Sequence, residues 1–484
     1  MPAATPDFES LSKEELVTVC KALWQAVQDL TARCEHLERR VQELEAGKPP
    51  KKTSQNSSVP PSNDQKPSIE SESRLAHKTA PDGPFARVEP RAKSVGRTGG
   101  GRRLDPNPDA HITLRPDTCE SCGVFLLDAL ERTHAVYEKI ELPEIKPVVT
   151  RITQLECTCT HCGTRTLATA PIGLEPGSPY GSSIQSLLTT LRFQHAISYQ
   201  RLSAVMNDVF DVSISEGAIS NSFENLLEKL KPRVSEITEA VRDGSGVMSD
   251  ETSARVNGKN WWEWVFLTTR ACLHVIKPSR AFDVIEGVFT REHLEIARPA
   301  FWVSDLHTAQ AKNPAEVWQV CLAHQLRDCQ FAVDAGDWLF APVMLGLFRR
   351  ALEIHKRREL LAVSTWVSYR NAIKHDLRTA LLINPVQADG RRLLKRYLKV
   401  RDSLLVFLEF PDVPATNNAS ERAIRWSVIF RRVTNGMRSL WGAELFAAVR
   451  SVVNSGGLHG WDAFDSIQRA LKPGLFLPVV QNLG

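Results

Sequence analysis

Apolar residues at the start of the chain recur at alternating spacings of four and three. The series runs unbroken through Leu16, Cys20, Leu23, Val27, Leu30, Cys34, Leu37, Val41 and Leu44. With leucine at d and small or β-branched residues at a, the pattern is typical of a parallel two-stranded coiled coil. The flanking charges agree, because Arg33 and Arg40 would face glutamates in the partner helix. We expect residues 1–46 to join two protomers; the alternative is an amphipathic helix docked on its own domain.

The apolar period disappears over residues 47–110. This stretch contains two Pro-Pro pairs, many serines and a run of three glycines at 99–101. A segment of this composition buries too little apolar surface to fold alone, so we predict a disordered linker. From Lys48 to Arg103 there are 12 basic and 5 acidic residues. Such a surplus suits contact with phosphate, although a merely soluble linker fits it equally well.

Helical spacing returns near residue 180. Apolar residues at 184, 187, 188 and 191 predict one amphipathic helix, residues 213–230 predict a second, and a third follows. Either a structural role or contact with DNA fits the helical region 176–244. Residues 313–408 are again predicted to be helical, and six basic residues lie between Arg391 and Arg401. The C-terminal part, 443–484, is predicted as a further helical region.

Short runs rich in aromatic and β-branched residues lie between these helical regions. They predict strands at 247–251, 261–269, 271–277 and 300–305, with a helix over 281–293. The order β-β-β-α-β is that of a ribonuclease-H-like α/β core, in which the first and fourth strands are neighbours. The fold class is therefore a multidomain α+β protein, with a core over 245–442 and a helical insertion at about 313–408.

Two Ser-Asp pairs close apolar runs on the first and fourth of these strands. They are Ser249-Asp250 and Ser304-Asp305, and neighbouring strands would bring the two acids together. Downstream, Glu421 follows asparagines of good helix N-cap type, which puts it in a first helical turn. Three carboxylates of this kind can hold divalent metal ions for phosphodiester chemistry. Most of the 56 acidic residues are expected to be solvated; position at strand ends distinguishes Asp250 and Asp305, and position in a first helical turn distinguishes Glu421.

Four of the ten cysteines form two CxxCG motifs, Cys119/Cys122 and Cys159/Cys162. A tight turn presents both thiolates of a motif to one ion, and four thiolates close a tetrahedral structural zinc site. We therefore predict a small zinc-binding module over 111–175, which either binds nucleic acid or serves as a scaffold. Cys321, His324 and Cys329 lack an obvious fourth ligand, so a core or site-lining role is preferred to a second zinc site.

The bulk composition adds only limits. A chain of 484 residues with 42% hydrophobic and 24% charged residues suits several globular domains. No apolar run approaches the length of a membrane span, and the N-terminus lacks the pattern of a secretory signal. We therefore expect a reducing, cytoplasmic location without membrane contact, where metal ligation by paired cysteines is favoured over disulfides.

Taken together, these motifs resemble the insertion-sequence-66 family of bacterial DDE transposases. The matching stretches, in chain order, are Asn56-Ser57-Ser58 with Pro60-Pro61-Ser62, the two CxxC motifs, Ser249-Asp250-Glu251-Thr252, Trp262-Glu263-Trp264-Val265-Phe266, Ser304-Asp305, Cys321-Leu322-Ala323-His324 and Thr416-Asn417-Asn418 with Ser420-Glu421-Arg422-Ala423-Ile424-Arg425. The resemblance implies that the catalytic acids are Asp250, Asp305 and Glu421. It implies cleavage at the ends of an insertion sequence and strand transfer into target DNA.

The same resemblance implies cofactors and partners. Two catalytic Mg²⁺ ions, replaceable by Mn²⁺, would be held by the three acids, beside one structural Zn²⁺. The partners would be terminal inverted repeats, target DNA, a second or further copy of the chain, and accessory proteins of the same element, in the bacterial nucleoid. The alternatives are a non-catalytic DNA-binding regulator, an inactive transposase copy, or a structure-specific nuclease that cuts without joining.

Overall fold

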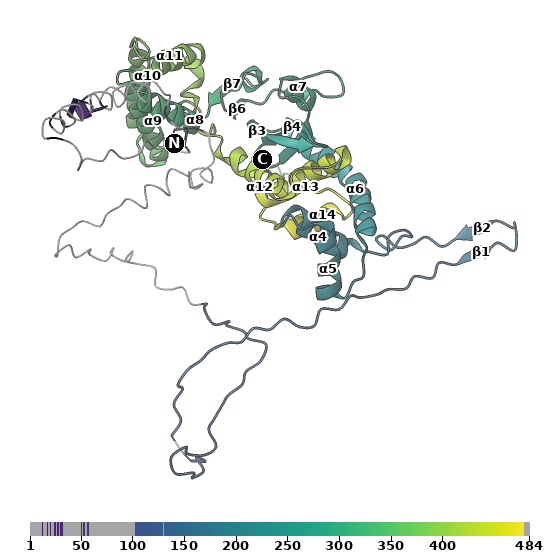
Figure 1. Cartoon of the computed structure of the whole chain (residues 1–484). Helices are drawn as coiled ribbons and strands as arrows, with labels where there is room; N and C mark the ends of the chain where they lie inside the picture. The colour runs from purple at the N-terminus through teal and green to yellow at the C-terminus, as the bar shows by residue number, and fades with distance from the viewer. Residues whose placement is uncertain are drawn as a thin grey trace. The chain divides into compact units, whose positions relative to one another are not determined.

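The computed structural model describes residues 102–128 and 130–478, together with a few single positions between residues 12 and 57 (Figure 1). The chain divides into two compact units, each described by itself. The larger comprises residues 1–66, 154–203 and 215–484, and the smaller comprises residues 67–153 and 204–214. Within the predicted coiled coil, the described positions between 17 and 31 are helical and exposed. The rest of that prediction, and most of the predicted linker, falls outside the described residues.

A mixed five-stranded sheet forms the centre of the larger unit, in the order β5-β4-β3-β6-β7. β3 (Gly246–Val256), β4 (Lys259–Leu267) and β5 (Cys272–Lys277) pair antiparallel. β6 (Phe301–Ser304) and β7 (Val317–Val320) continue the sheet in parallel with β3. The four predicted strands are confirmed, including the neighbouring positions of the first and fourth. β7 occupies the start of the stretch predicted to be helical, and its four residues are too few to show a period of two.

Three helices precede the sheet. They are α4 (Ser182–Phe193), α5 (Tyr199–Phe210) and α6 (Glu216–Arg242). The sequence predicted two helices where α6 is a single one that continues through Pro232. Buried apolar residues lie on both sides of the proline, including Leu226, Leu230, Ile237 and Val241. We attribute the continuity of α6 to this shared buried stripe, which offsets the hydrogen bond that proline cannot make.

Helices cover the sheet and its outer strand. α7 (Asp283–Phe289) packs Phe289 edge-on against Trp302 of β6, with ring centroids 5.2 Å apart. On the outer strand β5, the backbone N–H groups of Cys272 and His274 donate to the hydroxyls of Ser455 and Ser451. Both serines belong to α13 (Leu440–Leu458), which therefore satisfies donors that an open sheet edge would expose. The final helix, α14 (Ala463–Ala470), packs against α13 and α4.

The helical insertion has a hydrophobic core of its own. Its helices are α8 (Leu322–Asp334), α9 (Ala341–Lys356), α10 (Val363–Ala380) and α11 (Ala388–Val400). They bury a cluster of large side chains that includes Phe340, Phe348, Tyr397 and Phe407. Val303 and Val320 belong to the same cluster, so the insertion is anchored on β6 and β7. The chain then returns to the sheet as α12 (Asn418–Thr434).

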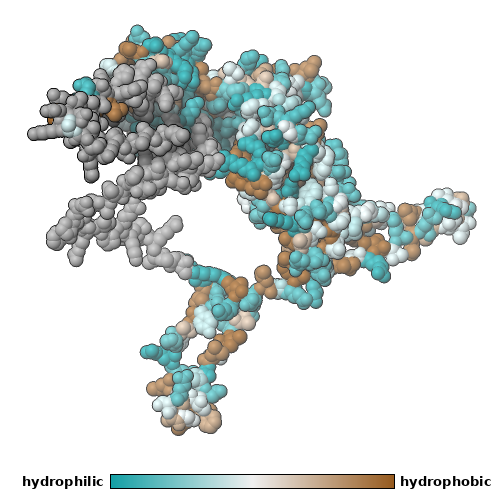
Figure 2. All heavy atoms as spheres, in the orientation of Figure 1, coloured by the Kyte–Doolittle hydropathy of each residue, from teal (hydrophilic) through white to brown (hydrophobic). Residues whose placement is uncertain are grey.

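Short 3-10 turns complete the larger unit; they are η2 (Gln310–Lys312), η3 (Arg358–Leu360), η4 (Arg401–Ser403) and η5 (Val406–Leu408). A two-stranded ribbon, β1 (Glu156–Thr158) with β2 (Arg165–Leu167), flanks the second cysteine motif. In the described residues from 102 to 153, regular pairing is limited to a bridge between Thr118 and Phe125. This stretch exposes apolar side chains such as Val148 and Val149, so it lacks a buried core (Figure 2).

Candidate active site

The parallel pair β3 and β6 positions two of the predicted acids. Their last paired residues are Met248 and Val303. Asp250 lies two positions beyond that pair on β3, and Asp305 directly follows β6. The sequence predicted Asp250 at the end of its strand. This was wrong, because β3 continues to Val256 against β4. The two acids nevertheless leave the same end of the parallel pair, as the strand order predicted.

The electrostatics of Asp250 show that the acids lie close together. Its carboxyl is buried, and burial raises its pKa well above the usual value of 3.8. The negative charges of Glu251, Asp305 and Glu421 raise the pKa of Asp250 further. The structure therefore brings Asp305 and Glu421 close to the buried Asp250 carboxyl, although more than a hundred residues separate Asp305 from Glu421 in the sequence.

Glu251 is a fourth acidic group that the sequence did not single out. Its side chain is 1% exposed and accepts hydrogen bonds from Arg280 at 2.9 Å and Gln310 at 2.8 Å. Burial and the charge of Asp305 raise the pKa of Glu251, while Gln310, Arg280 and His307 lower it. Strand alternation would point Glu251 away from the face of Asp250, so the sequence pattern gave no reason to include it.

The serines of the two Ser-Asp pairs are fully buried and hydrogen-bonded to neighbouring side chains. Ser249 accepts a hydrogen bond from Gln310 at 3.1 Å, and Ser304 accepts one from the Trp318 indole at 3.0 Å. Gln310 is also fully buried and accepts from the Trp302 indole at 3.0 Å. Its side chain thus ties β3 to β6, which fixes the spacing of the strands that carry Asp250 and Asp305.

Glu421 lies in the first turn of α12, as predicted. The preceding N-cap residue, Asn417, is fully buried; its amide donates to the Ser249 carbonyl at 3.4 Å, and its backbone N–H donates to Cys321 Sγ at 3.3 Å. Asn417 therefore ties the start of α12 to β3 and to the start of α8.

The start of α8 contributes three side chains beside Glu421. Glu421 Oε1 lies 3.5 Å from His324 Nδ1 and 3.6 Å from the Arg327 guanidinium. Burial, followed by the charge of Arg327, lowers the pKa of His324, and burial raises the pKa of Cys321 to about 11. Cys321 and His324 thus line the site, in line with the preferred prediction for them. Cys329 instead lies within the insertion, 3.2 Å from the Tyr397 hydroxyl.

Unpartnered polar atoms are concentrated at this junction. Of the eight buried side-chain nitrogen and oxygen atoms without a hydrogen-bond partner in the described part of the chain, five lie here. They are His324 Nδ1, Gln325 Oε1, Arg327 Nε, Asn417 Oδ1 and Glu421 Oε1. Buried polar atoms are nearly always paired in folded proteins, so this cluster of unpaired atoms distinguishes the junction from the rest of the described chain.

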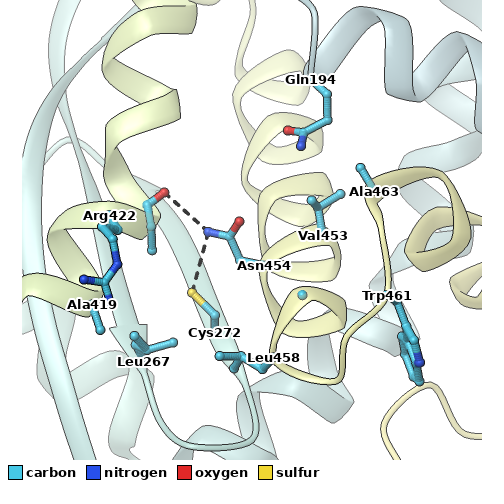
Figure 3. Close-up of a pocket in the computed structure, with 12 residues that line it drawn as sticks. Gln194, Leu267, Cys272, Ala419, Arg422, Val453, Asn454, Leu458, Trp461 and Ala463 are labelled. Atoms are coloured by element: carbon cyan, nitrogen blue, oxygen red, sulfur yellow. Dashed lines mark hydrogen bonds between the residues drawn. The ribbon is translucent and has the colours of Figure 1, made fainter. Parts of the chain in front are cut away.

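The first turns of α12 also line a separate pocket of about 400 Å³ (Figure 3). Ala419 and Arg422 of α12, Cys272 of β5 and Asn454 of α13 are among its lining residues. The Asn454 amide donates to His274 Nε2 at 2.8 Å and to the Ala423 carbonyl at 3.3 Å. None of the three predicted acids lines this pocket, so it is not the candidate active site.

Behind the pocket lies a buried polar cluster centred on Glu263 and His274. Glu263 Oε1 accepts from His274 Nδ1 at 2.8 Å and from the Ser427 hydroxyl at 2.7 Å. Arg450 donates to Asn454 at 2.8 Å and to Gln194. Burial lowers the pKa of His274, although the hydrogen bond and charge of Glu263 act in the opposite direction. The imidazole is therefore neutral, with its proton on Nδ1.

Each cysteine motif forms the same turn. The N–H of Gly123 donates to the Cys119 carbonyl at 2.8 Å, and that of Gly163 to the Cys159 carbonyl at 2.9 Å. Both glycines have φ near +70°, the left-handed region that glycine tolerates best. Local hydrogen bonds lower the pKa of Cys119, chiefly from the Cys122 backbone, and that of Cys162, chiefly with Thr164. Each turn is therefore shaped to present a pair of thiolates.

These features define a mixed α/β protein with a carboxylate-rich centre on its main sheet. The model of the transposase IS66 family matches residues 177–445, more than half of the chain, so the protein belongs to that family. Residues 3–80 match a family of unknown function (DUF6444). No curated relative matches the chain. The resemblance seen in the sequence is thus confirmed, and membership of this family implies DNA binding and a role in transposition. None of the helices in the described residues is long and apolar enough to span a membrane.

Proposed function

We propose that the protein is a DDE transposase that cleaves the ends of an insertion sequence and joins them to target DNA. Asp250, Asp305 and Glu421 are the catalytic acids. The observation that carries the proposal is the convergence of the three carboxylates from β3, from the end of β6 and from α12. The order β5-β4-β3-β6-β7, with three antiparallel strands followed by two parallel ones, supports a ribonuclease-H-like core.

The residues at this centre fit divalent magnesium. Mg²⁺ prefers oxygen ligands, and Asp250, Asp305, Glu421 and Asn417 offer carboxylate and amide oxygens. The unpartnered oxygens of Asn417 and Glu421, and the mutual repulsion of the acids around Asp250, are both relieved by a bound cation. Two such ions, or Mn²⁺ in their place, would supply activation of water and stabilisation of the leaving oxygen.

The reaction has two steps at one site. In the first, water attacks phosphorus at the element end, the bond to the 3′ oxygen breaks, and a 3′ hydroxyl is released. In the second, that hydroxyl attacks a target phosphodiester and displaces the target's own 3′ oxygen. Gln310 and Asn417 hold β3, β6 and α12 in fixed relation, so the three carboxylates keep their spacing through both steps. Arg327, which is about one-quarter exposed beside Glu421, is placed to hold a phosphate oxygen.

α12 provides the DNA surface we propose next to the acids. Arg425 is exposed and lies four residues after Glu421, on the same face of α12. On α11, by contrast, Arg392 already pairs with Asp389 at 2.6 Å. Arg425→Ala should weaken DNA binding uniformly and reduce its salt slope by about one. Arg392→Ala is the matched control, and an equal change in its salt slope would place the DNA elsewhere.

The direct test uses a labelled element end in the presence of Mg²⁺. Wild-type protein should cleave it, and a pre-cut end should yield strand-transfer products. Asp250→Asn and Asp305→Asn should lose both reactions. Cleavage that survives either change would assign the protein as a non-catalytic regulator contaminated by a nuclease, and cleavage without joining would assign a structure-specific nuclease. A folded wild type that binds the ends but does neither would be an inactive copy.

We also propose that Cys119, Cys122, Cys159 and Cys162 hold one structural zinc ion. The matching turns and the lowered thiol pKa values of Cys119 and Cys162 support it. By elemental analysis, Cys119→Ser should contain about one zinc per chain less than the wild type. A folded wild type free of zinc would contradict the assignment.

Finally, we propose that residues 1–46 join protomers so that two element ends are cut together. The unbroken heptad supports a homodimer or larger assembly. Deletion of these residues should lower the molecular mass measured by light scattering, and an unchanged mass would assign the segment to docking on its own domain.

A further inference from the structure

Three metal-binding side chains meet where α8 and α12 begin. Cys321 is the N-cap of α8, His324 lies in its first turn, and Glu421 lies in the first turn of α12. Their sulfur, nitrogen and oxygen atoms all lie within 4.8 Å of one another. In the described part of the chain, this is the one such group of three histidine, cysteine or acidic side chains.

The spacing of these atoms suits a shared ion better than a direct contact. His324 Nδ1 and Glu421 Oε1 are 3.5 Å apart, and neither has a hydrogen-bond partner. Two ligand atoms about 2.0–2.2 Å from a tetrahedral zinc ion are themselves about 3.4 Å apart. Cys321 Sγ is fixed by the Asn417 N–H, which stabilises a charged sulfur. The site is therefore already assembled without the ion.

The ligand types decide the class of ion. Thiolate and imidazole favour zinc-like transition metals, whereas Mg²⁺ prefers oxygen. Three protein ligands leave one position of a tetrahedral ion open. The charge of Arg327, 3.6 Å from Glu421 Oε1, opposes a cation there; its side chain is about one-quarter exposed and can turn towards solvent. Arg327 thus sets the affinity of the site without blocking it.

We propose that Cys321, His324 and Glu421 bind one zinc-class ion, separate from the zinc of the cysteine motifs. Such an ion holds Glu421, so it competes with the magnesium ions that need the same carboxylate. This second step rests on the proposed function, whereas ion binding itself does not. The consequence is an enzyme that zinc switches off by withdrawing one of its three acids.

Cobalt titration of the chelator-stripped, full-length chain tests the binding. Co²⁺ is a spectroscopic substitute for zinc, and a thiolate ligand gives an intense charge-transfer absorption. Cys321→Ser should lose about one bound Co²⁺ and the absorption of one thiolate relative to wild type. Cys329→Ser is the matched control, because Cys329 is a second buried cysteine at the same helix and lies against Tyr397. The cysteine motifs contribute equally to all three proteins, so they cancel in the difference.

Equal spectra and equal cobalt uptake for Cys321→Ser and Cys329→Ser would overturn the proposal. If Cys321→Ser does not fold, His324→Gln provides the same count at a partly exposed position. Arg327→Ala should tighten cobalt binding, since it removes a positive charge beside the ion. A wild type without cleavage would overturn the proposed function, yet the cobalt result would still decide whether Cys321, His324 and Glu421 bind an ion.

Zinc inhibition of Mg²⁺-dependent cleavage tests the competition. The zinc concentration that halves the rate should rise by at least about tenfold in Cys321→Ser, because losing even an outer partner of a metal ligand costs about ten- to hundredfold in affinity. Each protein is compared with its own zinc-free rate, and Cys329→Ser should match wild type. Unchanged inhibition in Cys321→Ser would show that zinc acts elsewhere.

Discussion

Two buried polar clusters lie on the same central sheet and differ in how well their atoms are paired. In the cluster of Glu263 and His274, the carboxylate accepts two hydrogen bonds and both imidazole nitrogens are engaged. Its one unpartnered side-chain atom is Arg450 Nε. Around Asp250 and Glu421, like charges face one another and five buried polar atoms have no partner.

The difference separates a structural role from a binding role. An unpaired buried polar atom costs about 1–3 kcal/mol, so a fold retains a group of them only where something else is gained. In the Glu263 cluster, internal hydrogen bonds offset the desolvation cost of burying the polar groups, and they join β4, β5, α12 and α13. Within the chain, nothing offsets the cost of the Asp250 cluster; under the proposed function, a bound cation or phosphate would offset it.

The largest expected effect is on catalysis. Asp250→Asn should reduce cleavage by at least about 10²- to 10³-fold, as the loss of one pre-organised electrostatic group does. Glu263→Gln, on the same sheet but with its hydrogen-bonding shape preserved, should keep cleavage near the wild-type rate as long as it folds. Initial rates on a labelled element end measure both. Similar losses in the two variants would remove the distinction between the clusters.

Stability should show the reverse order. Glu263→Ala leaves two buried donors, the His274 Nδ1–H and the Ser427 hydroxyl, without their acceptor, and each buried group left unpaired costs about 1–3 kcal/mol. Glu421→Ala removes one of several mutually repelling carboxylates and a partly exposed ion pair with Arg327, so it should cost less than about 1 kcal/mol in metal-free protein. Urea unfolding followed by circular dichroism measures both. A Glu421→Ala variant as unstable as Glu263→Ala would assign the Asp250 cluster a structural role.

The sequence predicted the Asp250 cluster better than the Glu263 cluster. Apolar runs placed Asp250 and Asp305 on strands that had to be neighbours, and the asparagines before Glu421 placed it at a helix start. No pattern in the sequence paired Glu263 with His274, because they lie on adjacent strands at diagonal positions and meet only in the actual register. Gln310, the tie between β3 and β6, comes from a 3-10 turn that has no sequence period.

Length also limited the prediction. β7 has four residues, and Pro232 lies inside a helix that only tertiary packing keeps continuous. The helical insertion was recognised, although its border was placed before β7. Local patterns therefore indicated which segments carry the acids, whereas the contacts that fix their spacing depend on residues brought together from distant parts of the chain.

Magnesium should stabilise the folded protein by binding at the Asp250 cluster and not at the Glu263 cluster. An ion that binds the folded chain alone adds about 2.7 kcal/mol at a hundred times its dissociation constant. Thermal unfolding should therefore shift upward with Mg²⁺ in the wild type and in Glu263→Gln, and much less in Asp250→Asn. This readout needs no DNA and no activity. An equal shift in all three proteins would place the magnesium away from Asp250.

The smallest effect concerns pH and the paired cluster. Burial holds the pKa of His274 below its ordinary value of 6.5, so the unfolded chain binds more protons than the folded chain just below that pH. The neutral imidazole therefore contributes stability that is present above pH 6.5 and is lost as the pH falls, by about 1.4 kcal/mol for each unit of separation between the two pKa values.

His274→Asn cannot titrate, so its unfolding free energy should depend less on pH between 7 and 5 than that of the wild type, whatever its starting stability. His459→Asn, at a partly buried histidine whose ring bonds the Arg270 carbonyl, is the comparison variant. An unchanged slope in His274→Asn would mean that the imidazole becomes charged without cost, and that the Glu263 cluster is less tightly closed than its hydrogen bonds indicate.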